Sequence, residues 1–529
     1  MRQGAAPLAL AGLPLAFLLV VLVAPAVRLV AEGWPTDGHS LQALWAPWQD
    51  DYLRWRMVWS FLQALLTCAA ALVLGLPLAW VLARLEFRGR SLVLRALMLP
   101  FVVPTLVAAL GVLALMGPHG VLVQLGGPDL QGTAWLLLYG NLFFNLCVVV
   151  RAGTDALEQV SASRLAAART LGASPWRAFW RVEWPAIAPW LMSALCLVFL
   201  YCFAGFGLAL VLGGQRYATV EVEIYTLVAH ELQLGQAGVL ALWMLMLTAL
   251  VAWGYAAIER QLATPGRADR QPRRRPQGAG HWLLVVVALG VYMLICALPL
   301  VAIAWKAIIS GAFLSSGEHA AWRVLLEEDT RMALWNTLRF SFSAVVLATV
   351  LGLAHALAAR RSLALRTLVF LPFLVSPVMV AFGLLLLYPS WTGNALLLVC
   401  AYALLAYPFV AKSVASALDS LPLYYLQAAR SLGATPLRAF WRVTLPLLAP
   451  ALRRGVAFAA ATAVGEFAVS LFLSRPEWAT LTTLIYQHLG RPGAANLDAA
   501  LVLACLLMAL TMGTFALIEW RGSREPDHA

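Results

Sequence analysis

Residues 156–191 read ALEQVSASRLAAARTLGASPWRAFWRVEWPAIAPWL, and residues 417–452 read ALDSLPLYYLQAARSLGATPLRAFWRVTLPLLAPAL. Aligned without gaps at an offset of 261 residues, the two stretches are identical at 20 of 36 positions. The match continues outside them, because Leu74-Gly75-Leu76 returns as Leu351-Gly352-Leu353 and Leu99-Pro100-Phe101 returns as Leu371-Pro372-Phe373. The chain is therefore predicted to consist of two related halves with the same order of elements.

The composition of these halves indicates a membrane protein. Of 529 residues, 62% are hydrophobic and 12% are charged, whereas charged residues make up about a quarter of a soluble domain. Twelve apolar stretches are long enough to cross about 30 Å of hydrocarbon as helices. We therefore expect an all-α polytopic membrane protein with about twelve transmembrane helices, at 8–30, 57–83, 92–116, 133–150, 189–213, 236–258, 282–306, 333–358, 364–388, 394–414, 452–473 and 495–518.

The repeat divides these spans into two transmembrane halves, residues 1–258 and 282–529. Because each half holds six spans, an even number, the halves have the same orientation and are parallel six-helix repeats. Residues 259–281 form a basic cytoplasmic linker whose Pro, Gly and Arg content argues against packed structure. The first span would be a signal peptide if Ala24-Pro25-Ala26 were cleaved, but its apolar run of about 20 residues is long for one and favours a retained helix.

Orientation follows from the basic residues. With a cytoplasmic N-terminus, the inner loops and ends hold 24 Arg or Lys and the outer loops hold only seven. The positive-inside rule then predicts that both termini are cytoplasmic. The net charge of +12 is mainly a determinant of topology, and we expect a lipid bilayer and no nucleic acid as its partner.

The repeated segments lie in two cytoplasmic loops, residues 155–188 and 416–449. Each pattern predicts a helix that ends at Gly172 or Gly433, and a second short helix that begins at Pro175 or Pro436. Aromatic and Arg side chains together are typical of protein interfaces, although an interfacial amphipathic helix would look similar. The duplication favours docking of two equivalent partners through Ala167, Ala168, Gly172, Arg177, Trp180, Arg181 and Pro185, and through Ala428, Ala429, Gly433, Arg438, Trp441, Arg442 and Pro446.

These loops resemble the EAA motif of permease subunits of binding-protein-dependent ABC importers, with its spacing of Gly and Leu-Pro. Both copies depart from the family at the first position, where Ala166 and Gln427 replace its Glu. The two fused halves are similar to the ferric-iron and thiamine branch of this family. Residues 48–53 (WQDDYL), the Phe143-Phe144-Asn145 run, the Gly213-Gly214 turn and the total length look most like thiamine permeases.

The resemblance implies a type I ABC importer permease fold in a bacterial inner membrane. It implies docking of two copies of a cytoplasmic ATP-binding subunit on the loops, and a periplasmic solute-binding protein outside. Because the halves are fused as a pseudo-dimer, one permease chain per complex is expected. The implied function is translocation of thiamine or its phosphate esters, with ferric iron or another small solute as the alternative. A secondary transporter is disfavoured, because it needs no duplicated docking loop.

The sequence predicts no enzymatic site and no cofactor bound by this chain. Neither GxxxxGK[ST] nor HExxH nor GxSxG is present. The seven Cys lie singly in apolar stretches, which predicts buried thiols. ATP hydrolysis is therefore expected on a separate subunit.

Ionisable residues inside spans point to a translocation pathway. Glu466 is the clearest, and its repeat partner is Gly205, so the pathway would hold one carboxylate suited to a cation such as thiazolium. A structural Glu that pairs with Arg or caps a helix break near Gly465 explains it equally well. Asn145 and Tyr201 would line the same path or form interhelical hydrogen bonds. His355 is interpreted as a packed histidine rather than a gate.

Overall fold

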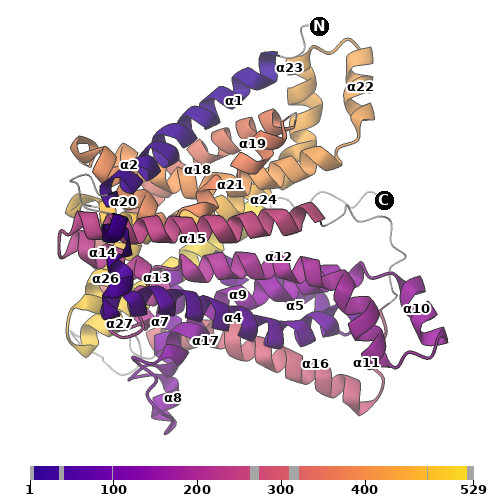
Figure 1. The fold of residues 1–529 in the computed structure, drawn as a ribbon, viewed down its shortest axis with the longest axis horizontal. Helices are drawn as coiled ribbons and strands as arrows, with labels where there is room; N and C mark the ends of the chain where they lie inside the picture. Colours follow the sequence, from indigo (N-terminus) through magenta and orange to yellow (C-terminus); the bar gives the residue numbers. More distant parts are fainter. Residues whose placement is uncertain are drawn as a thin grey trace. The chain divides into compact units, whose positions relative to one another are not determined.

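The computed structural model describes residues 5–34, 41–97, 99–261, 273–308, 321–360, 362–392, 394–473 and 475–520. Across these residues the chain is helical, and the only strand-like pairing is an isolated bridge between Leu85 and Arg274. Eleven helices of the described part are long and apolar enough to cross a membrane (Figure 1). The prediction of an all-α polytopic fold is confirmed.

The third span of each half is broken rather than continuous. The predicted span 364–388 divides into α19 (Leu363–Leu368), the 3₁₀ turn η7 (Leu371–Leu374) and α20 (Pro377–Leu387). Its counterpart at 92–116 divides into α5 (Arg90–Ala96), α6 (Leu99–Val102) and α7 (Thr105–Met116). Prolines at 100, 104, 372 and 377 lack the amide hydrogen that would continue the ladder. The prediction of one unbroken helix at each place is wrong for this reason.

The fifth spans begin earlier than predicted and also end in a break. The second helix of each repeated loop, α11 (Pro175–Ala178) or α23 (Pro436–Ala439), continues through a π turn into α12 (Trp184–Phe203) or α24 (Leu445–Val464). Each then stops, and a short helix follows, α13 (Gly207–Leu212) or α25 (Ala468–Leu473). Loop helix and span are thus one helix, Pro175–Phe203 or Pro436–Val464.

The described helices form two compact units. Unit 1 contains Met1–Trp34, Val102–Val107 and Ile308–Ala529. Within it α18 packs on α21, α21 on α24, and α24 on α27. Its main helices are α1 (Ala5–Leu18), α2 (Ala24–Gly33), α18 (Glu328–Ala359), α20, α21 (Ala395–Ser420), α22 (Leu423–Ser431), α23, α24, α25, α26 (Leu481–Gly490) and α27 (Ala494–Trp520).

Unit 2 contains Pro35–Phe101 and Ala108–Ala307. Here α4 packs on α9, and α12 packs on α4, α9 and α15. Its main helices are α3 (Ala46–Gln49), α4 (Asp51–Arg84), α5, α8 (Val121–Gln124), α9 (Ala134–Glu158), α10 (Ala162–Thr170), α11, α12, α13, α14 (Val220–Ala229), α15 (Leu234–Gln261), α16 (Gly278–Tyr292) and α17 (Leu298–Ile308).

The first span of each half therefore belongs to the unit of the other half. In unit 1, α2 packs on α20, and a Cβ atom added to Gly383 would lie 2.8 Å from the carbonyl oxygen of Pro25. In unit 2, a Cβ on Gly111 would lie 2.8 Å from the carbonyl oxygen of Pro299. Glycine at these two repeat-related positions permits the backbones to approach, as small residues do between membrane helices.

All four π turns in the described chain end two residues before a proline. They are η1 (Leu19–Val23), η3 (Phe179–Glu183), η4 (Met293–Ala297) and η9 (Phe440–Thr444). In η1 the amide of Ala24 donates to Leu19 O, so the next carbonyl, Val20 O, faces Pro25 and lacks a helical donor.

A tyrosine hydroxyl supplies the missing donor in both first spans. Tyr388 Oη donates to Val20 O over 3.0 Å in unit 1. Tyr139 Oη donates to the equivalent Leu294 O over 2.5 Å in unit 2. These hydrogen bonds satisfy carbonyl groups to which hydrocarbon could donate no hydrogen bond. They also fix each first span to the unit in which it packs.

The predicted linker 259–281 is partly structured. α15 extends to Gln261 and α16 begins at Gly278, while residues 262–272 lie outside the described residues. Arg274 pairs with the end of α4, since its amide donates to Arg84 O and its carbonyl accepts from Glu86 N, both over 2.9 Å. The expectation that this stretch lacks packed structure is wrong for its C-terminal part, because the backbone pairs with residues 84–86.

Substitution of Gly111 by Ala tests the close approach of α7 and α17. The added methyl group would meet Pro299 O, so we expect a loss of about 1–3 kcal/mol of stability. Gly290→Ala in α16 is the matched control, because nothing lies within 4 Å of its Cβ position. The midpoint of thermal unfolding in detergent should fall for Gly111→Ala only, and equal midpoints would contradict this packing.

Candidate functional site

The first repeated loop consists of two helices joined by a glycine turn. α10 ends in a Schellman motif, in which Ala173 N donates to Ala168 O and Gly172 N to Arg169 O, both over 3.0 Å. Gly172 has φ +78°, a conformation that favours glycine. The hydroxyl of Ser174 then accepts from Arg177 N and caps α11.

The second loop repeats this geometry. Ala434 N donates to Ala429 O over 3.0 Å and Gly433 N to Arg430 O over 2.9 Å, with φ +79° at Gly433. Thr435 replaces Ser174 and accepts from Arg438 N. The expected helix, glycine turn and capped second helix are thus present in both copies.

Both loops present large apolar side chains to solvent. Leu171 and Leu432, at equivalent positions beside the glycines, are 87% and 88% exposed. Ala178 and Ala439 are buried on the inner side of the second helix. Of the predicted docking residues, Ala168 and Ala429 are half-buried and the others are exposed, namely Ala167, Gly172, Arg177, Trp180, Arg181, Pro185, Ala428, Gly433, Arg438, Trp441, Arg442 and Pro446.

Aromatic rings stiffen the exposed surface of the first loop. The ring centroids of Trp176 and Trp180 are 5.6 Å apart, and those of Trp180 and Trp184 are 5.3 Å apart. Leu437 takes the place of Trp176 in the second loop, where Phe440 and Trp441 remain in contact at 5.7 Å. Exposed, rigid aromatic and aliphatic groups of this kind bind a protein surface at low entropic cost.

A second candidate site lies at the break after the fifth span of unit 1. The carboxylate of Glu466 accepts from Val469 N over 3.1 Å and thereby caps α25. The backbone oxygen of Glu466 accepts from Thr482 Oγ1 over 3.0 Å. Within the described chain Glu466 forms no ion pair with Arg, so of the two structural explanations the helix-cap contact is the one observed. The residue as a whole is partly buried.

The equivalent break in unit 2 is held by amides instead. Gln63 Nε2 donates to Cys202 O over 2.8 Å, and Gln63 Oε1 accepts from Asn141 Nδ2 over 2.6 Å. Asn145 Nδ2 donates to Asn141 O over 2.9 Å and contacts Cys202 Sγ at 3.2 Å. All three amides are at most 4% exposed. Asn145 thus lies in a buried interhelical network.

The remaining predicted residues are separate from these networks. Tyr201 is 40% exposed, and its ring centroid lies 6.5 Å from that of Phe101. His355 is buried, with Nε2 2.8 Å from Leu365 O and its ring stacked on Tyr407. The contacts of His355 are those of a packed histidine.

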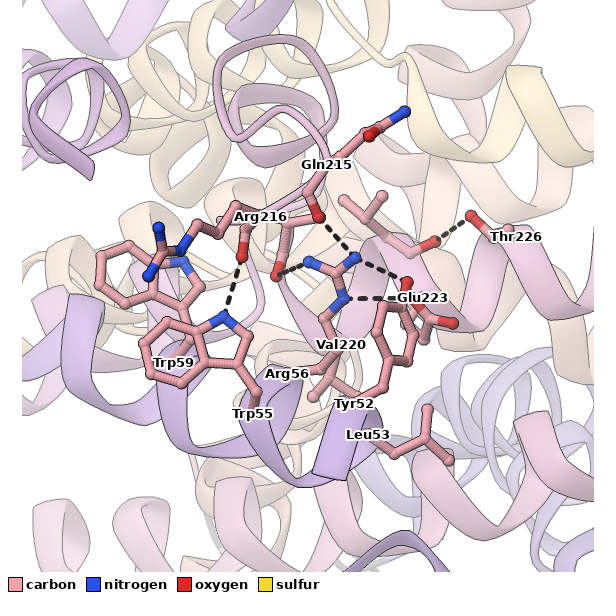
Figure 2. A network of polar contacts seen from close by, with 12 residues as sticks. Tyr52, Leu53, Trp55, Arg56, Trp59, Gln215, Arg216, Val220, Glu223 and Thr226 are labelled. Atoms are coloured by element: carbon pink, nitrogen blue, oxygen red, sulfur yellow. Dashed lines mark hydrogen bonds and ion pairs between the residues drawn. The ribbon is translucent and has the colours of Figure 1, made fainter. Parts of the chain in front are cut away.

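Sequence reasoning missed a buried ion pair at the predicted outer end of α4 (Figure 2). Arg56 Nε lies 3.3 Å from Glu223 Oε2, and Tyr52 Oη donates to the same oxygen over 2.9 Å. Arg56 also donates to Gln215 O over 2.7 Å. Burial raises the pKa of Glu223, while the hydrogen bond from Tyr52 and the charge of Arg56 oppose this rise. The network fastens α14 to α4.

Part of this contact between the second span and the short helix after the break is present in both halves. Ser60 Oγ accepts from Val220 N over 2.8 Å in unit 2, and Thr337 Oγ1 accepts from Leu481 N over 2.9 Å in unit 1. Ala333 and Leu484 occupy the repeat positions of Arg56 and Glu223. Arg56 and Glu223 are 167 residues apart in sequence, so no local pattern links them. Only the difference between the two halves at these positions would have indicated the ion pair.

Comparison with known proteins accounts for both repeats. The family model described as binding-protein-dependent transport system inner membrane component matches residues 71–264 and 344–520. The thiamine transport system permease protein of Escherichia coli (strain K12) is 30% identical over 95% of this chain and 94% of its own length. That of Haemophilus influenzae is 27% identical over 89% of each chain.

A shorter relative matches only part of the chain. The molybdenum transport system permease protein of Azotobacter vinelandii is 33% identical over 37% of this chain and 90% of its own length. A family model that covers both halves, with relatives that match nearly end to end, shows that the chain belongs to the binding-protein-dependent transport system inner membrane components.

Proposed function

We propose that this chain is the permease of an ATP-driven importer that carries thiamine or its phosphate esters. The observation that carries the proposal is the pair of matched, solvent-exposed loops on a chain whose near full-length relatives are thiamine permeases. A periplasmic binding protein would deliver the solute. Both termini would be cytoplasmic, as the distribution of basic residues favours.

Each loop would seat one copy of a cytoplasmic ATP-binding subunit, so one fused permease chain would bind two. Movement of that subunit would act directly on the membrane part, because loop helix and fifth span form one helix in each half. The far end of this helix is the break beside Gly205 or Glu466. A displacement of the loop would therefore reach the break along one continuous helix.

The chain itself would bind no cofactor and no nucleotide. During transport the chain would bind the thiazolium cation of thiamine weakly and then release it. Glu466 suits this task in the proposed pathway, since its carboxylate lies at a helix break and forms no ion pair with Arg within the described part of the chain. The hydrogen bond from Val469 N would hold one carboxylate oxygen and leave the other for the cargo.

Uptake measurements test the proposal as a whole. A strain that depends on this permease should accumulate labelled thiamine and should not accumulate ferric iron above background. Uptake of ferric iron instead of thiamine would assign the chain to the other cargo. Uptake that continues without the ATP-binding subunit would contradict an ATP-driven importer.

Docking is tested by removing the exposed leucines of the loops. The double variant Leu171→Ser and Leu432→Ser should weaken binding of the ATP-binding subunit roughly tenfold or more, because exposed apolar anchors dominate interface energy. Leu326→Ser is the control, since this leucine is 86% exposed but lies outside the loops. Co-purification and titration of the isolated subunit measure the effect. Unchanged affinity of the double variant would refute docking at these loops.

The pathway role is tested by Glu466→Gln, which keeps the side-chain oxygen that accepts from Val469 N and removes the charge. Thiamine uptake should fall roughly tenfold or more, because a hydrogen bond to a charged group contributes about 1.5–3 kcal/mol. Membrane assembly and binding of the ATP-binding subunit should be normal. Glu477→Gln on the exposed turn η10 (Pro476–Trp478) is the control. Normal uptake by Glu466→Gln would remove Glu466 from the pathway.

A further inference from the structure

One arginine anchors the base of each docking loop. Arg90 Nε donates to Leu82 O over 2.7 Å, and Arg90 Nη2 donates to Glu158 Oε1 over 2.8 Å. Glu158 is the last residue of α9, directly before the loop. The arginine thus ties the start of the first loop to the cytoplasmic end of α4.

The second half contains the same anchor. Arg366 Nε lies 3.3 Å from Ala359 O, and Arg366 Nη2 donates to Asp419 Oδ1 over 2.8 Å. Asp419 is the repeat partner of Glu158 at the offset of 261 residues. Recurrence of the contact in both halves indicates that it belongs to the loop machinery.

The two anchors differ in burial. The side chains of Arg90 and Glu158 are 8% and 25% exposed, whereas those of Arg366 and Asp419 are 45% and 50% exposed. Water and salt screen an exposed ion pair and leave a buried one largely unscreened. The ion pair of the first anchor is therefore less screened than that of the second.

Within the described part of the chain, further charges contact the first anchor and none contacts the second. Arg273 of the linker contacts Glu158 Oε1 at 3.0 Å and Glu86 Oε2 at 3.4 Å. Arg84 Nη2 contacts Glu183 Oε1 at 2.6 Å, with both side chains nearly buried, and this pair holds the other end of the loop. Thr444 occupies the position of Glu183 in the second half, so its carboxylate has no counterpart there.

We propose that Glu158, Glu183 and Arg273 are positioning residues that lock the first docking loop to residues 84–90 and to the linker. The two ATP-binding subunits then act on the permease unequally. The first loop moves as one body with α4 and α12, and the second retains freedom at its base. Arg273 and Arg274 at the end of the linker act as a strap on the first loop. This inference rests on the proposed docking function.

The test uses the complete importer in proteoliposomes, with the binding protein and the ATP-binding subunits. Glu158→Gln should reduce stimulation of ATP hydrolysis by the loaded binding protein roughly fivefold or more, at the lower end of ordinary coupling factors. It should also raise the ATP hydrolysed per thiamine transported. Asp419→Asn should change stimulation about twofold or less, as expected for a screened surface pair.

A milder variant guards against misfolding of Glu158→Gln. Arg273→Gln removes an exposed strap residue and should lower stimulation in the same direction. Arg275→Gln is its control, because Arg275 is exposed and forms no ion pair within the described chain. Binding of the ATP-binding subunit should be normal in all four variants, which separates loss of coupling from loss of docking.

Two results would overturn the inference. One is equal loss of stimulation in Glu158→Gln and Asp419→Asn, and the other is full stimulation in both Glu158→Gln and Arg273→Gln. Failure of the unaltered chain to bind any ATP-binding subunit would instead refute the proposed function.

Discussion

The hydrocarbon core of a bilayer offers no hydrogen-bond donor or acceptor, and this constraint governs the irregular places in this structure. A proline after a π turn leaves Val20 O and Leu294 O without a helical donor, and a tyrosine supplies one in each case. At the break after α12, Cys202 O accepts from Gly205 N over 3.3 Å and from the side-chain amide of Gln63 over 2.8 Å. The break after α24 is closed by Glu466, Ser470 and Thr482. At these interruptions side chains pair with backbone groups, in addition to the backbone hydrogen bonds that remain.

The two halves solve the same backbone problem with different chemistry. The neutral amides of Gln63 and Asn141 hold the break in the first half. In the second half, Phe340 and Tyr402 occupy the repeat positions of these two residues. A carboxylate and hydroxyl groups hold the second break. The difference continues at the outer contact, where Arg56 and Glu223 are replaced by alanine and leucine. The two halves therefore share their backbone geometry at these places and differ in the side chains that support it.

Local chemistry was predictable from the sequence, and tertiary pairing was not. Gly172, Pro175 and their repeat partners predicted the loop helices correctly, because a positive φ and a proline at a helix start act within a few residues. The breaks at Pro372 and Pro377 were missed, since hydropathy counts proline in an apolar run as part of the span. The cap made by Glu466 was one of two explanations left open. Interhelical hydrogen bonding of Asn145 was one of its two predicted roles, and the structure shows it. The partners in the amide network and the Arg56 pair depend on contacts between distant helices, for which periodicity gives no sign.

The exchange of first spans sets the order in which the chain can mature during synthesis. α1 and α2 emerge first, but α18 and α20, against which they pack, are made more than 300 residues later. Unit 2 likewise waits for α16 and α17 before its packing is complete. Neither unit can therefore complete its packing from the residues of one half alone. The first span must remain in the lipid until the helices against which it packs have been synthesised. Because the two halves are fused in one polypeptide, each first span is made together with one copy of the helices against which it packs.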